Sequence, residues 1–459
     1  MLADAPQYLR ARWLWLRALG LIFLSAFYSL LFQIHGLIGP NGILPARDYL
    51  RAVRDAVGAK AYWLAPTLLW LDAGDLALHI LVWTGIAASL AIVFNIVPRA
   101  AIAVAGVAFL SFVAAAQEFS GYQSDGMLLE AAFLSLFLGR ADQAPPRAAV
   151  FMLQWEWFRI YFESGVVKIL SGETQWRDLT AMDKYYENGP LPTWLGWHAQ
   201  QLPHGFHAAT AAATLVIELL VAALVFFPKK SRLIAFAITT PLQIGIILTG
   251  NYAFLNYLVL ALGIFLIETP KNIPSSQRPN IPTIAALAIV FVTTVASFFA
   301  PGFPTVRLLD PFRIANSYGL FAVMTRERYE IEFQGTRDST TWIAYPFPYK
   351  PQDPREPPGI YAPYQPRFEW NLWFAALGDW RDNPWVVQTE ARLLQNEPAV
   401  LRLFAGNPFA AAPPTQVRAV KWRYWFTTRE ERRRTGAWWR RELIGDYAPP
   451  TPFSRQQTR

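Results

Sequence analysis

Three charged residues lie close together in a stretch of the chain that is otherwise apolar enough to enter a membrane. Arg159 and Glu163 are four positions apart, which places them on one face of a helix, and Lys168 follows about one turn later. Charges are costly inside lipid, so a chain that keeps them there commonly uses them. Because desolvation favours neutral lysine, which accepts a proton, Lys168 is the candidate catalytic base, with His79 or Glu163 to orient it.

Further polar residues in the apolar part of the sequence extend this candidate site. Asp72, Asp75 and His79 stand at positions i, i+3 and i+7 of one helix face. Glu130 opens another apolar segment, and Glu218 lies in the middle of a third. One interpretation is a polar pocket inside a helical bundle, lined by these residues and open to the outside.

Ion pairing is a structural interpretation of the same residues. In the pocket interpretation Arg159 lines the pocket, whereas in the pairing interpretation it pairs with Glu163. Lys168 then pairs with Glu163, Glu218 or a lipid headgroup. Near the end of a helix Lys168 can also extend its stem along the lipid and keep its charge in water. The pocket interpretation makes the chain a membrane enzyme, whereas the pairing interpretation does not.

The composition is that of a membrane protein with aromatic residues at both interfaces. Of the 459 residues, 53% are hydrophobic and only 16% are charged, against about 25% charged residues in soluble domains. The 19 tryptophans and 18 tyrosines suit the two membrane–water interfaces. The chain has no cysteine, which excludes disulfides, thiolate metal ligands and thiol catalysis by its own side chains.

Apolar runs near 20 residues long match the thickness of a bilayer and predict about nine membrane spans. The first run is longer than the apolar core of a signal peptide, so we expect it to be retained. The fold class is a polytopic α-helical membrane bundle over residues 1–300. Its spans are expected near 12–33, 73–95, 99–118, 125–139, 149–170, 208–227, 232–249, 252–267 and 281–299.

The positions of the cations predict the orientation of the spans, with the N-terminus inside. The inside segments or their edges carry Arg10, Arg12, Arg99, Arg140, Arg147, Lys229, Lys230, Arg232, Lys271 and Arg278. The outside then holds residues 34–72, the turns near 119–124 and 250–251, the loop 171–207 and everything after Ala300. Within the first outside segment, residues 45–60 have amphipathic spacing, which fits either a helix at the membrane interface or an ordinary surface helix.

The tail, residues 301–459, predicts a soluble β-rich domain on the outside, which the loop 171–207 is positioned to meet. It has no long apolar run and is rich in proline, arginine and aromatic residues. At about 150 residues it is long enough for one domain. Strands are expected at Tyr329–Gln334, Thr341–Tyr345 and Lys421–Thr427, and helices at Asn371–Leu377 and Trp385–Leu394.

Signatures of common active sites and metal sites are missing from the sequence. There is no GxSxG elbow, HExxH pair, Walker loop or GxGxxG turn. His204 and His207 are interpreted as interfacial residues rather than metal ligands, so we expect no metal and no cofactor. The run Arg432–Arg434 is interpreted as an exposed face or a contact with lipid headgroups, and nucleic acid is not expected as a partner.

Four stretches of the sequence together resemble the lipase maturation factor family. They are GYQSDGMLLEAAFLSLFL at Gly121–Leu138, SGVVKILSGETQWRDLTAMDKYYENGPLPTW at Ser164–Trp194, NSYGLFAVMT at Asn316–Thr325 and YQPRFEWNLWFAALG at Tyr364–Gly378. The resemblance implies a multi-pass membrane protein that helps secreted lipases to fold and assemble. It also implies that the C-terminal domain engages the client protein.

This resemblance sets the expected partners and location. Eukaryotic members lie in the endoplasmic reticulum membrane, and a bacterial member is expected in the inner membrane. The expected role is that of a membrane-anchored folding factor, or chaperone, for lipases or other exported proteins, in contact with membrane lipids. The expected client-binding residues are exposed aromatic side chains of the outer domain, namely Trp370, Trp373, Tyr424 and Trp425.

The membrane half, through SGVVK, is also similar to the horizontally transferred transmembrane proteins that include vitamin K-dependent γ-carboxylase. This similarity implies that Lys168 is the base of an enzyme acting on a lipid, quinol or exported peptide. A structural partner within a membrane complex is a third interpretation. The arrangement of five residues distinguishes these interpretations, since their convergence on one cavity favours the enzyme. They are Asp75, His79, Glu130, Glu163 and Lys168.

Overall fold

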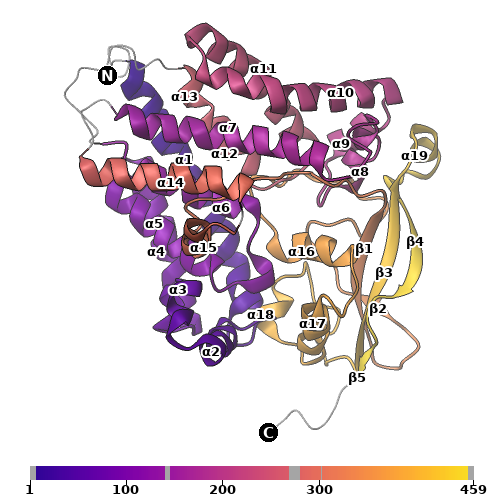
Figure 1. The fold of residues 1–459 in the computed structure, drawn as a ribbon. Coiled ribbons are helices and arrows are strands. Elements are labelled where there is room, and N and C mark those ends of the chain that lie inside the picture. The colour runs from indigo at the N-terminus through magenta and orange to yellow at the C-terminus, as the bar shows by residue number, and fades with distance from the viewer. Residues whose placement is uncertain (1–6, 140–144, 268–279, 301, 453–459) are drawn as a thin grey trace.

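The structure, a computed structural model, describes residues 7–139, 145–267, 280–300 and 302–452 (Figure 1). Three cations used above for orientation, Arg140, Lys271 and Arg278, lie outside the described residues. The regular structure of the described residues up to 300 is helical, apart from an isolated β-bridge between Pro192 and Gly250. Its elements are α1 Gln7–Ile38, α2 Ala46–Val57, η1 Gly58–Lys60, α3 Ala61–Leu64, η2 Leu68–Trp70, α4 Asp75–Val93, α5 Pro98–Val113, η3 Gln117–Phe119, α6 Gln123–Ser135, α7 Arg147–Leu170, η4 Ala181–Asp183, α8 Tyr185–Asn188, α9 Trp194–Gln200, α10 His204–Val216, η5 Ile217–Val221, η6 Ala222–Phe226, α11 Lys229–Thr249, α12 Leu255–Leu262, α13 Ile264–Ile267 and α14 Ile281–Phe299.

Within the described ranges, five helical stretches are long and apolar enough to cross a membrane, so the prediction of nine spans is too high by this measure. They are Arg10–Ile38, Asp75–Val93, His204–Phe226, Lys229–Thr249 and Ile281–Phe299. Helices also form at the other four predicted positions, but α5, α6 and the pair α12–α13 are short. The 16 residues of α5 rise about 24 Å, whereas the hydrocarbon of a bilayer is about 30 Å thick. Helix α7 is long enough, with 24 residues, but it carries the buried charges.

Helices α1 and α4 pack along one another in the bundle. Their close approach depends on Gly85 of α4, because a Cβ atom there would lie 2.2 Å from the ring of Phe27. Phe27 is buried and packs edge-on against Phe109 of α5, with 5.9 Å between ring centroids. This aromatic layer holds α1, α4 and α5 together, and a larger side chain at position 85 would force them apart.

The C-terminal part contains a small antiparallel sheet in the order β2-β1-β3-β4, with β5 paired to β3. The predicted strands at 329–334 and 421–427 correspond to β1 and β3. The strand predicted at 341–345 is shorter in the structure, where β2 has only two residues. A register shift between Lys421 and Trp422 marks a bulge, which increases the local twist of β3. The strands are β1 Arg328–Thr336, β2 Ile343–Ala344, β3 Gln416–Phe426, β4 Trp439–Asp446 and β5 Thr451–Pro452.

Two helices near the predicted positions, α16 (Arg367–Ala376) and α17 (Pro384–Leu394), pack on the sheet. In Figure 1 they lie between the sheet and the helical bundle. Helix α19 (Arg429–Thr435) joins β3 to β4, begins with a capping box of Thr428 and Glu431 and ends at a left-handed glycine. The remaining short helices are α15 Pro304–Leu309, η8 Asp310–Phe312 and α18 Pro398–Leu401.

One hydrophobic core runs through both parts of the chain. Buried residues of the bundle helices and of β1, α16 and α17 belong to the same cluster. Phe119 of η3 packs against Trp385 of α17 at 5.3 Å between ring centroids, and Tyr122 packs against Trp370 of α16 at 5.9 Å. The boundary near residue 300 stays a prediction, but the two parts bury apolar surface against each other.

Candidate functional site

The charges of α7 point to two different sides of the helix. At about 100° per residue, Arg159 and Glu163 stand roughly 40° apart, whereas Glu163 and Lys168 stand roughly 140° apart. Helix geometry therefore gives Lys168 different neighbours from the other two residues. All three are nevertheless buried, with 1%, 3% and 1% of their surface exposed. Lys168 does not extend into water, which corrects the interfacial interpretation.

Arg159 is held by Glu130 of α6 and by the chain that connects η8 to β1. Its guanidinium donates to one carboxylate oxygen of Glu130 and, at 2.5 Å, to the backbone oxygen of Asn316. The other oxygen of Glu130 accepts from the Tyr318 hydroxyl at 2.9 Å and from the Asn316 backbone N–H at 3.0 Å. Glu163 lies farther from the guanidinium, at 3.9 Å. The main partner of Arg159 is therefore Glu130 and not Glu163, the partner expected from the sequence.

Lys168 forms an ion pair with Glu218 on another side of α7. Its Nζ donates to Glu218 Oε1 at 2.9 Å and to the backbone oxygen of Leu320 at 2.8 Å. The ring of Trp176 covers the ammonium, with 5.1 Å from Nζ to the ring centroid. Glu218 lies in the π-helical turn η5, a rare element that interrupts the regular helix between α10 and η6. The sequence analysis left Glu163, Glu218 and a lipid headgroup open as partners of Lys168, and in the structure its partner is Glu218.

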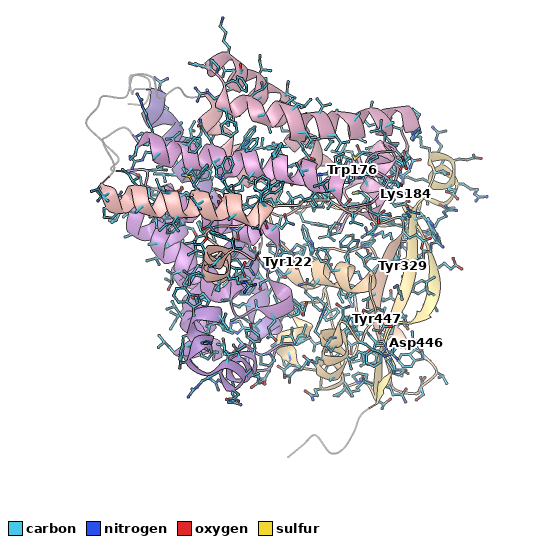
Figure 2. The ribbon with its side chains drawn as sticks, in the orientation of Figure 1. Tyr122, Trp176, Lys184, Tyr329, Asp446 and Tyr447 are labelled. Carbon is cyan, nitrogen blue, oxygen red and sulfur yellow. The ribbon has the colours of Figure 1, made fainter. Side chains whose placement is uncertain are left out.

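Both groups of charges hold the same piece of chain, residues 316–321, which we call the anchored segment. It belongs to no helix or strand, so side chains must satisfy its backbone. Its N–H groups donate to α6 and α7 in the pairs Tyr318–Glu163 at 2.6 Å, Gly319–Gln123 at 2.9 Å and Leu320–Ser164 at 3.1 Å. Its carbonyl oxygens accept from Arg159, Lys168 and Trp176. Figure 2 shows Trp176 at the junction between the bundle and the sheet.

A third buried ion pair joins α6 to α16. Arg367 donates to both carboxylate oxygens of Asp125, each at 2.8 Å, and to the backbone oxygen of Phe119 at 3.0 Å. Both charged side chains are fully buried, and the guanidinium carbon lies 4.9 Å from the ring centroid of Phe112. Because a bidentate pair is geometrically specific, this contact fixes the C-terminal part against the bundle.

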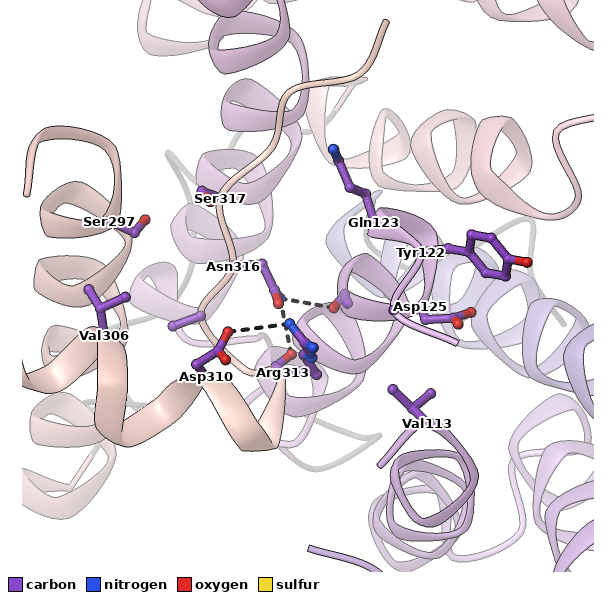
Figure 3. Close-up of a pocket in the computed structure, with 13 residues that line it drawn as sticks. Val113, Tyr122, Gln123, Asp125, Ser297, Val306, Asp310, Arg313, Asn316 and Ser317 are labelled. Atoms are coloured by element: carbon purple, nitrogen blue, oxygen red, sulfur yellow. Dashed lines mark hydrogen bonds and ion pairs between the residues drawn. The ribbon is translucent and has the colours of Figure 1, made fainter. Parts of the chain in front are cut away.

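A small cavity lies beside these networks, between α6, α15, η8 and the chain that follows η8 (Figure 3). Its volume is about 120 Å³, and Gln123 and Asn316 are among its lining residues. Asn316 reaches α6 by donating to the backbone oxygen of Gly126 at 3.0 Å. Pockets for small molecules usually measure about 300–1,000 Å³, so this cavity suits water molecules rather than a substrate. Lys168 is not among its lining residues.

Asp72, Asp75 and His79 form a separate group at the start of α4. His35 of α1 lies between two of them, with Nδ1 2.7 Å from Asp75 Oδ1 and Nε2 2.8 Å from His79 Nδ1. Asp72 pairs with Arg47 of α2 at 3.0 Å. The polar residues therefore divide into separate groups, each with its own ion-pair or hydrogen-bond partners, rather than lining one pocket. His79 is held by His35 and does not orient Lys168.

Three of the four aromatic residues expected to bind clients are buried. Trp370, Trp373 and Tyr424 are 8%, 9% and 2% exposed. The expectation of exposure is wrong for them because α16 packs between the sheet and the bundle, and because Tyr424 lies on the inner face of β3 against Trp439. Trp425, the next residue of β3, lies on the opposite face and is partly exposed.

The loop between α7 and α10 meets the sheet through Arg328 of β1. Arg328 donates to the backbone oxygens of Glu187 and Pro190 at 3.0 Å and pairs with Glu330 on its own strand. Lys350 pairs with the other carboxylate oxygen of Glu330 at 2.9 Å. These contacts confirm the predicted meeting of the loop 171–207 with the C-terminal part.

Glu369 of α16 gives the C-terminal part a dependence on pH. Its carboxylate accepts from the backbone N–H groups of Tyr349 and Lys350, and burial raises its pKa from 4.5 to about 8. The folded protein therefore keeps a proton that the unfolded chain releases above pH 4.5, so stability falls as the pH rises through about 8.

We expect the unfolding midpoint of the wild-type protein to fall by about 5 °C between about pH 6 and pH 9. Glu369→Gln removes this titration and is expected to flatten the curve, as measured by scanning fluorimetry in detergent. The same decrease in both proteins would assign the effect to another group.

Reasoning from the sequence missed Asp125, Arg367, Asn316 and Tyr318 as parts of the junction. All four lie in the stretches that carried the family resemblance, Gly121–Leu138, Asn316–Thr325 and Tyr364–Gly378. One sequence feature could have identified Asp125 and Arg367 as candidates. They carry opposite charges, and each lies in a motif that is mainly apolar and aromatic. Such a signal identifies candidates for pairing but does not connect them.

Comparisons with known proteins decide the family. The model of the lipase maturation factor transmembrane domain matches residues 10–272, and that of the lipase maturation factor C-terminal domain matches residues 314–449. The chain belongs to the lipase maturation factor family. Over its whole length it is 30% identical to lipase maturation factor 1 of Bos taurus, of which it covers 92%. No solved structure matches the chain.

Other lipase maturation factors match over similar lengths. The chain is 30% identical to lipase maturation factor 2 of Gallus gallus over 96% of its own length and 81% of that protein. It is 29% identical to lipase maturation factor 1 of Homo sapiens over 98% of its length and 90% of that protein. The two family regions meet at the junction described above, since the anchored segment opens the second region while Glu130, Arg159 and Lys168 belong to the first.

Proposed function

We propose that this member of the lipase maturation factor family is a membrane-embedded protein that assists the folding or assembly of lipases or other exported proteins. The observation that carries the proposal is the match of the whole chain to lipase maturation factor 1 of Bos taurus, at 30% identity. Both family regions are present in this chain, and they are joined by the buried Arg367–Asp125 pair and by the hydrogen bond from Lys168 to the Leu320 backbone oxygen. The membrane is the inner membrane in a bacterium and the endoplasmic reticulum membrane in a eukaryote.

The proposed orientation has the N-terminus inside and the C-terminal part outside. Four segments predicted to lie outside each form a hydrogen bond of 3.0 Å with the C-terminal part, which supports their placement on one side. The pairs are Gly42–Arg392, Phe119–Arg367, Pro190–Arg328 and Asn251–Gly359. An odd number of spans places the C-terminal part outside, and the nine-span order also places all four segments there.

An enzyme that uses Lys168 as a base is not favoured. Its Nζ is 2.9 Å from a carboxylate oxygen and 2.8 Å from a backbone oxygen, under the ring of Trp176. The residues proposed to assist it, His79 and Glu163, bind His35 and the Tyr318 backbone instead. These contacts fit a structural role for Lys168 in fastening the anchored segment.

The client contact of this proposal lies on the outer face of the sheet. The guanidinium carbons of Arg423 and Arg440 lie 4.8 Å and 5.8 Å from the ring centroid of Trp425. Lys421 lies 4.5 Å from the ring centroid of Tyr329 on the neighbouring strand. Alternating cations and aromatic rings suit a client surface that carries carboxylates.

Deletion of the gene from its host tests the function. We expect secreted lipase activity, or the activity of another exported client, to fall while the mRNA of that client stays constant. A plasmid copy of the gene is expected to restore the activity. An unchanged set of exported proteins and activities in the deletion strain would contradict the proposal.

Two neighbouring substitutions in β3 separate client binding from folding in the same assay. Trp425→Ala is expected to lower the yield of active client about tenfold, with little change in the unfolding midpoint, because the ring is partly exposed. Tyr424→Ala is expected to cost about 3–5 kcal/mol of stability because its ring is buried. Wild-type client yield in Trp425→Ala would remove this face as the contact.

A further inference from the structure

An apolar groove runs between α4 and α5 on the surface of the bundle. Its volume is about 500 Å³, and Leu71, Ile80 and Val104 are among its lining residues. These side chains are 87%, 57% and 43% exposed, although all three are aliphatic. Soluble proteins rarely expose such a continuous apolar surface. Beside a membrane helix, the chemical partner of this groove is a hydrocarbon chain.

A second hollow adjoins the groove and carries arginine side chains. Its volume is about 340 Å³, and it lies between α2 and η2. Its cationic lining residues are Arg47, Arg51 and Arg54 of α2. The two hollows are continuous because they share the lining residues Leu69, Leu71 and Asp72. An apolar channel therefore ends beside a cluster of cations.

The arginines of α2 stand on one face of the helix, since their spacings are four and three residues. Arg47 pairs with Asp72, but Arg51 makes only a 3.8 Å contact within its own helix and is 68% exposed. Arg54 is exposed and forms no ion pair with any described residue. The charged lining residues are these three arginines and the carboxylates of Asp55 and Asp72, and Asp48 is the partner of the 3.8 Å contact to Arg51.

We propose that the two hollows form one binding site for a phospholipid. The headgroup phosphate binds Arg51 and Arg54, and an acyl chain fills the groove between α4 and α5. A phosphate ion would leave the groove uncovered, and an uncharged lipid would leave the arginines unneutralised, whereas a phospholipid matches both surfaces. Arginine is the cation best suited to phosphate because its planar fork donates two parallel hydrogen bonds.

The surroundings of the site fit a helix that lies in the membrane interface. The segment after α2 exposes Tyr62 and Trp63, at 53% and 46%, and aromatic residues of this kind gather at the level of lipid headgroups. Of the two interpretations of residues 45–60, this site favours the interfacial helix over an ordinary surface helix. The inference does not depend on the client proposal, because it rests on other residues.

Native mass spectrometry of the full chain in detergent tests the proposal. The protein is stripped of lipid and titrated with dioleoyl phosphatidylglycerol, dioleoylglycerol or glycerol 3-phosphate. Only the phospholipid is expected to remain bound. Arg51→Gln/Arg54→Gln, which removes the phosphate contacts, and Ala103→Trp, which fills the groove, are each expected to weaken binding at least tenfold. The matched control Arg355→Gln/Arg434→Gln removes two exposed arginines of the C-terminal part and is expected to bind like the wild type.

The outcomes distinguish the possible ligands. Equal binding of dioleoylglycerol would show that the arginines contribute nothing, and equal binding of glycerol 3-phosphate would assign them to free phosphate. Either result overturns the proposal, as does wild-type binding by the two site variants. Because Arg51, Arg54 and Ala103 are exposed, the variants are expected to keep the unfolding midpoint of the wild type, which is measured on the same samples.

Discussion

Replacement of Arg367 by alanine is expected to lower the free energy of unfolding by about 3–5 kcal/mol. The substitution leaves the Asp125 carboxylate, which is fully buried, without its bidentate partner. It also removes the donor to the backbone oxygen of Phe119. Since this pair joins α6 to α16, we expect the C-terminal part to lose its fixed position against the bundle. Scanning fluorimetry in detergent measures the loss as a lower unfolding midpoint.

An exposed arginine of the same part provides the control. Arg381 pairs with Asp379 at 3.3 Å, but these side chains are 71% and 53% exposed. Arg381→Ala is therefore expected to cost less than about 1 kcal/mol. Equal midpoints for Arg367→Ala and Arg381→Ala would show that the buried pair does not fasten the two parts. A double-mutant cycle with Asp125→Asn then measures the coupling between the two side chains directly.

The second large effect is expected for Lys168→Ala, which leaves the Glu218 carboxylate buried and without its cation. The substitution also removes the donor to the Leu320 backbone oxygen in the anchored segment. We expect a loss of about 3–5 kcal/mol, visible as a lower unfolding midpoint. Since the role proposed for Lys168 is structural, client maturation is expected to fall together with stability.

A lysine in the adjoining loop is the matched control. Lys184 pairs with Glu187 at 3.3 Å, and its side chain is 50% exposed. Lys184→Ala is expected to change stability by less than about 1 kcal/mol and to leave client maturation intact. A Lys168→Ala protein with the wild-type midpoint but no activity would instead support the catalytic interpretation.

The longer helices and the strands β1 and β3 follow from the sequence because each has its own local signal, whereas β4 was not predicted. The span expected at 149–170 is α7, Arg147–Leu170, and the helix expected at Trp385–Leu394 is α17. The cost of burying charge also pointed correctly to residues that need partners. The number of spans did not follow, because a short helix inside a bundle is as apolar as one that crosses lipid. Helix α6, with 13 residues that are nearly all buried, is such a case.

The partners of the buried charges did not follow from the sequence, because they come from distant parts of the chain. Asn316 is 157 positions from Arg159, and Arg367 is 242 positions from Asp125. Spacing within a helix shows which side chains share a face but not which segment covers that face. The buried Tyr424 shows the same limit in a strand, since both faces of β3 carry aromatic and basic residues.

The double variant Lys168→Met/Glu218→Leu tests the central claim, that these buried charges fasten the anchored segment and do not catalyse a reaction. Replacing a buried ion pair by apolar residues of similar size is often neutral for stability. We therefore predict that the double variant recovers most of the unfolding midpoint lost in Lys168→Ala and restores the yield of active client. A double variant that regains the midpoint but stays inactive would contradict the account and return Lys168 to the role of a base.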